Sequence, residues 1–102
     1  MKQQYTLQLT KDAPNQQFFT NFNGYKIGVR LHTFRGIIYA SIYINDEMTR
    51  SGVKCLNGIN ILGNSISQMV GCELKFETTQ RRTPDSSLFN GADCVLYMNE
   101  IG

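Results

Sequence analysis

Few residues of this chain have the types and spacing that catalysis needs. His32 is the only histidine, and a serine or cysteine nucleophile activated by a base would most simply use it. No spacing in the sequence links Ser41, Cys72 or Cys94 to this histidine. We therefore expect His32 to be a surface or interface residue and the protein not to be an enzyme. A small enzyme that relies on His32 is the weakest alternative.

The carboxylates and glycines give no stronger sign of a site. Asp46 and Glu47 fall where a turn is expected, and Glu73 and Glu77 flank Lys75 on one strand face, which is typical of a solvated surface. No glycine-rich loop has the spacing that binds phosphate groups. We expect no cofactor.

The three cysteines, Cys55, Cys72 and Cys94, are widely spaced and form no CxxC or Cys/His cluster. A zinc site is therefore not expected. Each cysteine lies among apolar neighbours, which favours buried free thiols over a disulfide. Free thiols are typical of a protein made in a reducing cytoplasm.

Strands are expected to position these residues, because apolar and polar side chains alternate along much of the chain. In residues 25–31 every second residue is apolar, which is the period of a strand with one buried face. Residues 36–44 are apolar on both faces, so we expect this strand to be covered on both faces. The link at residues 32–36 suits a hairpin. We interpret the two strands as a central antiparallel pair.

Further strands are expected on both sides of this pair. Asn23-Gly24 separates two alternating runs and is a strong hairpin signal, because both residues tolerate positive φ. Turns are expected at residues 10–15, 45–47 and 57–58, and a polar, exposed connection at residues 79–93. The other expected strands are residues 4–9, 16–22, 48–56 (interrupted at Ser51 and Gly52), 71–78 and 94–100.

This pattern predicts an all-β fold, a small antiparallel β-barrel or sandwich of about seven strands. A short helical turn or loop is expected near residues 59–70, across an end of the sheet. The length of 102 residues suits a single domain over residues 1–102. The net charge of +2 does not point to nucleic acid or a membrane, and no apolar run approaches the roughly 18 residues of a membrane span.

Nucleic-acid binding is nevertheless an alternative function. Basic residues interleaved with aromatic residues on an open sheet are how OB-type folds hold single strands. Such residues occur here on the two central strands, namely Lys26, Arg30, His32, Arg35, Tyr39 and Tyr43.

The first hypothesis from the residues is a protein-protein interface. The strand at residues 36–44 carries more apolar surface than a chain of this size can easily bury on both sides, and aromatic residues are enriched in interface cores. We predict an interface that includes Ile37, Tyr39, Tyr43, Arg30 and Arg35. The alternative is that residues 59–70 cover this apolar surface within the same chain.

Four segments follow one another in a recognisable order: YTLQL at residues 5–9, FFTNFNGYKIGVRLHTF at 18–34, GIIYASIYINDEMT at 36–49 and GVKCLNGINIL at 52–62. Arg30-Leu31 lies in a hairpin strand, an aromatic strand and its Asn-Asp turn follow at residues 39–45, and a glycine-hydrophobic segment follows at 52–62. This order resembles the small baseplate plug proteins of contractile-tailed bacteriophages. The aromatic that often begins the central strand in that family, a tryptophan, is Ile38 or Tyr39 here.

The resemblance implies a structural virion protein that acts without turnover. It implies a plug-like domain that seals the hub and tail tube on the tail axis, through contacts with the baseplate hub and with tail tube or spike proteins. It also implies a homo-oligomer, a trimer, around that axis. The implied location is the tail baseplate of the virion, after assembly in the host cytoplasm, with no membrane partner.

Overall fold

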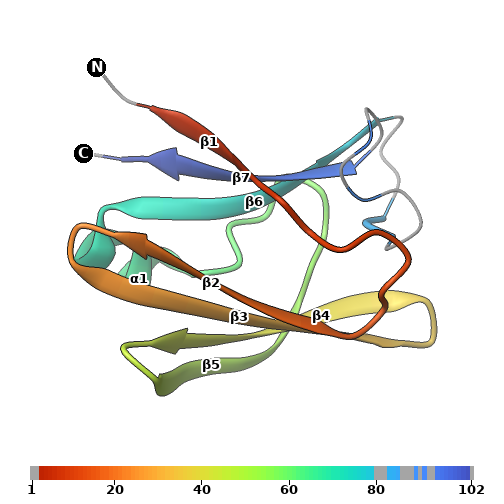
Figure 1. Ribbon diagram of the computed structural model, residues 1–102, viewed down its shortest axis with the longest axis horizontal. Coiled ribbons are helices and arrows are strands. Elements are labelled where there is room, and N and C mark those ends of the chain that lie inside the picture. The colour runs from red at the N-terminus through yellow and green to blue at the C-terminus, as the bar shows by residue number, and fades with distance from the viewer. Residues whose placement is uncertain (1–2, 80–82, 86–88, 90, 92–93, 102) are drawn as a thin grey trace.

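Two antiparallel β-sheets pack face to face in the computed structural model, which describes residues 3–79, 83–85, 89, 91 and 94–101 (Figure 1). The three-stranded sheet has the order β1-β7-β6 and consists of β1 (Gln4–Leu7), β7 (Cys94–Glu100) and β6 (Cys72–Thr78). The four-stranded sheet has the order β2-β3-β4-β5 and consists of β2 (Gln16–Phe22), β3 (Tyr25–Phe34), β4 (Ile37–Ile44) and β5 (Glu47–Lys54). One short helix, α1 (Asn64–Val70), precedes β6. The predicted all-β fold, with about seven strands and a short helical element, is confirmed.

Tight two-residue turns join the strands of the four-stranded sheet. Each turn has positive φ at both central residues, with φ of 51° and 82° at Asn23-Gly24, 51° and 76° at Arg35-Gly36, and 51° and 70° at Asn45-Asp46. Such turns match the right-handed twist of the strands they join. The hairpin predicted at Asn23-Gly24 is therefore confirmed.

The five-residue link predicted at residues 32–36 is wrong, because β3 continues to Phe34 and only Arg35-Gly36 forms the turn. His32 pairs with Tyr39, and Phe34 pairs with Ile37. The chain before β2 also holds this end of β3, since Thr33 donates its backbone N–H to Asn15 Oδ1 at 3.1 Å.

Alternate residues of the strands form one hydrophobic core between the sheets. Burying each large aliphatic side chain stabilises the fold by roughly 1.5–3 kcal/mol. The buried strand residues are Ile27, Val29 and Leu31 of β3, Ile38, Ala40, Ile42 and Ile44 of β4, Cys72, Leu74 and Phe76 of β6, and Cys94, Leu96 and Met98 of β7.

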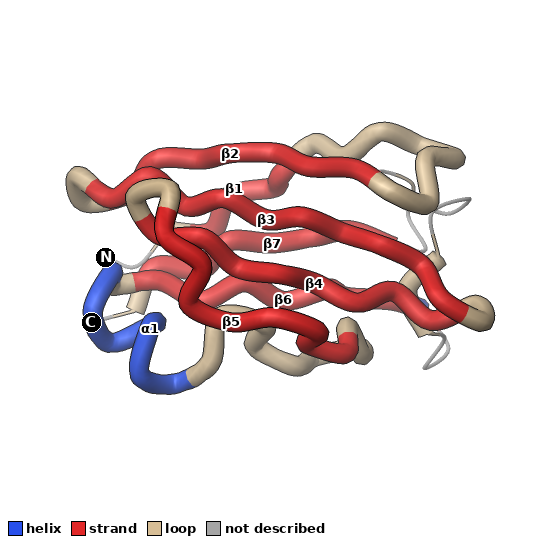
Figure 2. The backbone as a smooth tube through the Cα atoms, turned by 90° about the horizontal axis from the view of Figure 1, so that it is seen from below, coloured by secondary structure: helices blue, strands red, loops and turns tan. Residues whose placement is uncertain are grey.

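The expectation that the strand at residues 36–44 is covered on both faces is wrong. Its even-numbered residues are buried, whereas Ile37, Tyr39 and Tyr43 are only half-buried on the other face. The three-stranded sheet covers only the inner side of the four-stranded sheet (Figure 2). Residues 59–70 do not cover the other side of the four-stranded sheet, because their Ile61 and Leu62 are fully buried in the core between the sheets.

The first strand and the strand after β4 each end two residues earlier than predicted. The first strand ends at Leu7 rather than at residue 9, because the chain leaves the sheet there and inserts Leu9 into the core. The strand predicted at residues 48–56 is β5, Glu47–Lys54. Its expected interruption is a bulge, since the pairing register with β4 shifts near Gly52, which has φ of 65°.

The connection predicted to be polar and exposed at residues 79–93 contributes to the core. Phe89 is 2% exposed and its ring stacks on Phe76, with centroids 5.9 Å apart, and Pro84 is also buried. The adjacent apolar residues Leu88 and Phe89 in a mostly polar stretch show no strand or helix periodicity, so the sequence pattern did not reveal this contact. Several residues of this predicted connection lie outside the described residues: Arg81, Arg82, Ser86, Ser87 and Asn90.

Residues 55–63, which we call the closing segment, cross from β5 to the three-stranded sheet (Figure 1). The Cys55 N–H donates to the Ile38 carbonyl of β4 at 2.9 Å. Farther on, the Gly58 N–H donates to the Phe76 carbonyl of β6 at 2.8 Å. The segment therefore hydrogen-bonds to both sheets, and the turn predicted at residues 57–58 is part of it.

Asn60 fastens the closing segment. Its Oδ1 accepts hydrogen bonds from the backbone N–H groups of Leu62 at 3.2 Å and Leu74 at 3.1 Å. Its Nδ2 donates to Ser67 Oγ of α1 at 2.7 Å, and Ser67 is only 2% exposed. One side chain thus joins the closing segment, the helix and β6.

We predict that Asn60→Ala lowers the free energy of unfolding by about 2–3 kcal/mol, because it leaves buried polar groups without partners. Urea denaturation measures this change. Asn21→Ala, at an exposed position of β2, is the matched control and should change stability by less than about 0.5 kcal/mol. Equal losses in the two variants would contradict the role of Asn60.

Candidate interaction surface

The side of the four-stranded sheet that faces away from the three-stranded sheet is the outer face, and no element within the described ranges forms a layer over it (Figure 2). Four of the five predicted interface residues, Arg30, Ile37, Tyr39 and Tyr43, lie on it, and Arg35 lies in the turn at its end. Pairing across the strands brings further residues to this face. They include Gln17 and Phe19 of β2, Lys26, Gly28, His32 and Phe34 of β3, Ser41 of β4 and Met48 of β5.

A row of apolar side chains crosses the outer face over all four strands. Phe19 pairs with Gly28, Gly28 with Tyr43, and Tyr43 with Met48. Phe19 is 51% exposed and Met48 is 52% exposed. We call these four residues the apolar row.

Gly28 makes room for the apolar row. A Cβ atom at residue 28 would lie 2.9 Å from the Phe19 ring and 3.3 Å from the Tyr43 Cβ. The Phe19 ring therefore rests on the backbone of Gly28, and Lys26 Nζ lies 4.5 Å from the centre of the same ring. An aromatic ring over a strand glycine restores packing that the glycine lacks.

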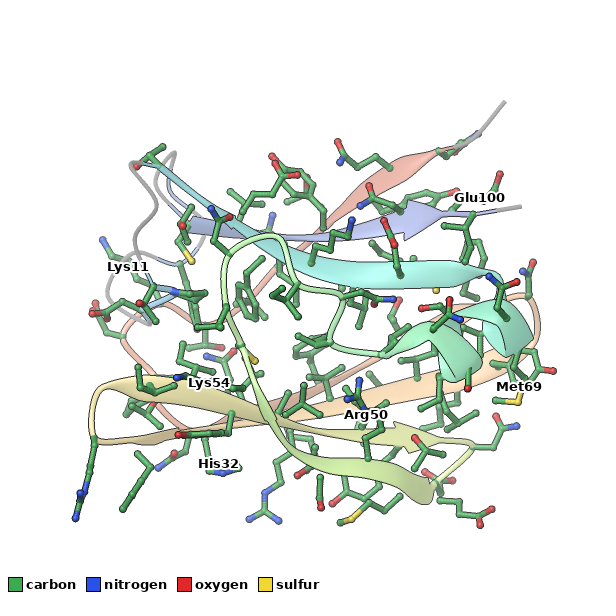
Figure 3. All side chains as sticks on the ribbon, turned by 180° about the vertical axis from the view of Figure 1, so that it is seen from behind. Lys11, His32, Arg50, Lys54, Met69 and Glu100 are labelled. Atoms are coloured by element: carbon green, nitrogen blue, oxygen red, sulfur yellow. The ribbon has the colours of Figure 1, made fainter. Side chains whose placement is uncertain are left out.

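A second group of rings lies nearer the turn at Arg35-Gly36. The His32 and Tyr39 rings stack with centroids 5.7 Å apart and an interplanar angle of 21°. Phe34 is 59% exposed, and the Arg35 guanidinium lies 5.2 Å from the centre of its ring. Figure 3 shows His32 projecting from the four-stranded sheet away from the rest of the molecule.

The cations on the outer face differ in whether they form an ion pair. Lys26 Nζ lies 2.9 Å from Asp46 Oδ1 in an exposed ion pair, which contributes at most about 1 kcal/mol. Arg30 forms no ion pair with a described residue. It lines an open depression together with Asn15, Gln16, Gln17, Leu31 and His32.

The structure does not assemble a catalytic group around His32. Cys72 and Cys94 lie on the other sheet with their side chains in the core. Ser41 lies on the same face as His32 but pairs with Arg30, and no hydrogen bond joins it to His32. Among the described residues, no group of three His, Cys, Asp or Glu side chains is placed to hold a metal ion.

As expected, Glu73, Lys75 and Glu77 lie on one face of β6. Lys75 Nζ lies 3.1 Å from Glu73 Oε1 on the outer side of β6, where Glu77 is exposed. No helix in the described part of the chain is long and apolar enough to cross a bilayer.

The three thiols are free and buried, as expected. Burial raises the pKa of Cys55 to about 12. Burial, and after it the charge of Glu73, raises the pKa of Cys72 to about 11. Burial also raises the pKa of Cys94. Because the thiolate is the reactive form, these cysteines are suited to packing and not to nucleophilic chemistry.

Sequence analysis missed Phe19, Phe34, Met48 and Gly28 as parts of this surface. The alternation in residues 16–22 already placed Phe19 on the opposite face from Phe18 and Phe22, so a signal for Phe19 was present. Phe34 was assigned to the turn. For Met48, no sequence signal distinguishes a residue of this surface from any exposed residue of an edge strand.

A comparison with protein families adds a match over almost the whole chain. The family model described as "Cyanophage baseplate Pam3 plug gp18" matches residues 4–100. No individually curated protein matches the chain.

We predict that Gly28→Ala lowers the free energy of unfolding by about 1 kcal/mol, because its methyl group displaces the Phe19 ring. In the Phe19→Ala background the same change should be neutral or stabilising by up to about 1 kcal/mol, since glycine is unfavourable in a strand. Urea denaturation of the double-mutant cycle measures the coupling. Additive effects would show that the ring does not rest on residue 28.

We predict that the stability contributed by the Cys55 thiol is lost at alkaline pH. Its folded pKa of about 12 lies above the ordinary 9.0, so the folded state binds more protons between these values. The contribution is therefore complete below pH 9 and falls as the pH rises toward 12, by up to about 1.4 kcal/mol per pH unit.

The measurement is the difference in unfolding free energy between the wild type and Cys55→Ala, at several pH values from about 8 to about 10.5. Titration of tyrosines and lysines cancels in this difference. A difference that does not change with pH would contradict the prediction.

Proposed function

Because the chain belongs to the cyanophage baseplate plug family, we propose that it seals the axial hub and tail tube of a contractile phage tail through protein-protein contacts. Membership in the family indicates a structural protein of the tail baseplate in the virion. The sealing itself, and the partners that the protein meets there, are the proposal.

The observation that carries this proposal is the outer face. Phe19, Phe34 and Met48 are each more than half exposed there, on a sheet face that no described element covers. Exposed apolar surface such as the apolar row marks a site of interaction. Aromatic side chains and methionine are enriched in interfaces, and arginine is too, which fits Arg30 on the outer face and Arg35 at its end.

A seal needs no turnover, and family membership implies a non-enzymatic role. His32 is stacked on Tyr39 on the outer face, where it would contribute to contacts rather than to chemistry. A plug of this kind acts by shape and by contact, and it needs no cofactor.

The proposed partners are the baseplate hub and the tail tube or spike proteins. An axial position brings several copies of one chain around the axis, for which a trimer is the proposed state. Buried free thiols suit assembly in a reducing host cytoplasm before the virion is released.

Single-stranded nucleic-acid binding is the second candidate, because Arg30 and the stacked pair of His32 and Tyr39 lie together on one open sheet face. Such binding would weaken steeply with salt and would be lost in Arg30→Ala with Tyr39→Ala. Fluorescence anisotropy of a labelled oligothymidine measures it. A signal that is absent or independent of salt would exclude this candidate.

We predict that the tagged chain, co-expressed with the reading frames that flank its gene, co-purifies with a baseplate protein. The double variant Phe19→Ser with Met48→Ser should reduce the retained partner by about tenfold or more, because it removes the exposed ends of the apolar row. The amount of partner is read by quantitative mass spectrometry.

The matched control is Ile59→Ser with Met69→Ser, which alters two residues that are 47% and 49% exposed elsewhere on the surface. Met69 lies on α1, at a distance from the outer face (Figure 3). The control should retain the partner within about twofold of the wild type. No retained baseplate protein, or equal losses in both variants, would contradict the proposed function.

A further inference from the structure

We infer that the outer face binds a protein surface that presents carboxylates among apolar side chains, with one carboxylate bound to Arg30 in its depression. This inference rests on the proposed function, since it names the chemistry of the partner for the same surface. It follows from the charges, the free hydrogen-bond donors and the position of Arg30 between two groups of rings.

The charge that remains unpaired on the outer face is positive. Lys26 is neutralised by Asp46 at 2.9 Å. Arg30 is exposed, and neither it nor Arg35 has an ion-pair partner among the described residues. A partner that covers this face must supply carboxylates, because a buried guanidinium without a counter-charge costs several kcal/mol.

The depression beside Arg30 has free donors of the kind that bind a carboxylate. The Gln16 amide is already engaged, since its Nε2 donates to the Thr10 and Ala13 carbonyls. Asn15 is engaged only as an acceptor, through the bond from the Thr33 N–H to its Oδ1. Gln17 pairs directly with Arg30 across the strands. The guanidinium group of Arg30 matches the two oxygens of a carboxylate, and the side-chain amide of Gln17 adds a third hydrogen-bond donor.

Arg30 lies between two sets of aromatic side chains. Its partner on β4 is Ser41, which is 8% exposed and lies between Tyr39 and Tyr43. Side chains two residues apart along a strand are separated by about 7 Å. A carboxylate at Arg30 would therefore have the apolar row on one side and the stacked His32 and Tyr39 rings on the other.

Two other occupants fit this face less well. A second copy of the chain would bring the unpaired Arg30 and Arg35 groups of both copies to one interface. A nucleic acid would bring phosphates to the end of the apolar row where Asp46 and Glu47 precede Met48.

The test uses the full chain and a random copolymer of glutamate and tyrosine as the probe, because it combines carboxylates with apolar rings. Polyglutamate and oligothymidine are the comparison probes, and binding is measured by biolayer interferometry. Arg30→Glu should weaken binding of the copolymer by about tenfold or more. Arg30→Gln, which keeps a polar side chain of similar size at this exposed site, should weaken it in the same direction.

The matched control is Lys11→Glu, which makes the same change in net charge. Lys11 is exposed in the connection before β2 and lies between the levels of the two sheets (Figure 3). It should leave binding within about twofold of the wild type. Thermal unfolding verifies that each variant is folded before binding is compared.

Four results would overturn the inference: no binding of the copolymer, tighter binding of oligothymidine, equal binding of polyglutamate, or equal losses in Arg30→Glu and Lys11→Glu. The proposed function is read separately in the co-purification experiment. If no baseplate protein co-purifies while the copolymer binds through Arg30, the proposed function is contradicted. The inference that the outer face binds carboxylates among apolar groups is then still supported.

Discussion

The backbone hydrogen bonds that the closing segment makes to both sheets are the constraint on which the rest of the structure depends. Within the described residues, no strand of one sheet pairs with a strand of the other. The segment links β4 to β6 through Cys55 and Gly58, and Asn60 fastens its middle to α1. The groups that Asn60 bonds belong to the buried residues Leu62, Ser67 and Leu74, so leaving them unpaired would cost free energy that apolar packing must otherwise supply. The sheets are thus held in one relative position.

That fixed position explains why one strand has two different faces. The three-stranded sheet covers the inner side chains of β4, such as Ile38 and Ile42, and leaves Tyr39 and Tyr43 outside. The side-chain period of a strand is two residues, so inner and outer residues alternate along β4, although Ser41 on the outer face is also buried. The outer face is where we propose that a partner binds, and no loop is needed there to present the proposed binding residues. Rigid strands hold those residues in place, and little conformational entropy is lost on binding.

Much of the fold could be predicted from the sequence, because alternation and Asn-Gly corners are local signals. β2 and β7 have the predicted bounds, and β6 differs by one residue. The end of β3 could not be predicted in this way, since Arg35 adopts a positive φ for which arginine has no particular preference. Phe89 reaches the core by a contact distant in sequence, and such contacts leave no periodic trace. The predicted interface residues lie on or beside one face, yet whether they bind a partner stays a prediction, because alternation reports exposure and not the identity of what covers it.

The close approach of the Phe19 ring to the backbone of Gly28 has a consequence for how this protein changes over generations. Residue 28 has no space for a side chain while residue 19 carries a ring. A methyl group at residue 28 is therefore tolerated better when residue 19 carries a smaller side chain. The two positions are therefore expected to drift as a linked pair, although they lie on different strands and nine residues apart in the chain.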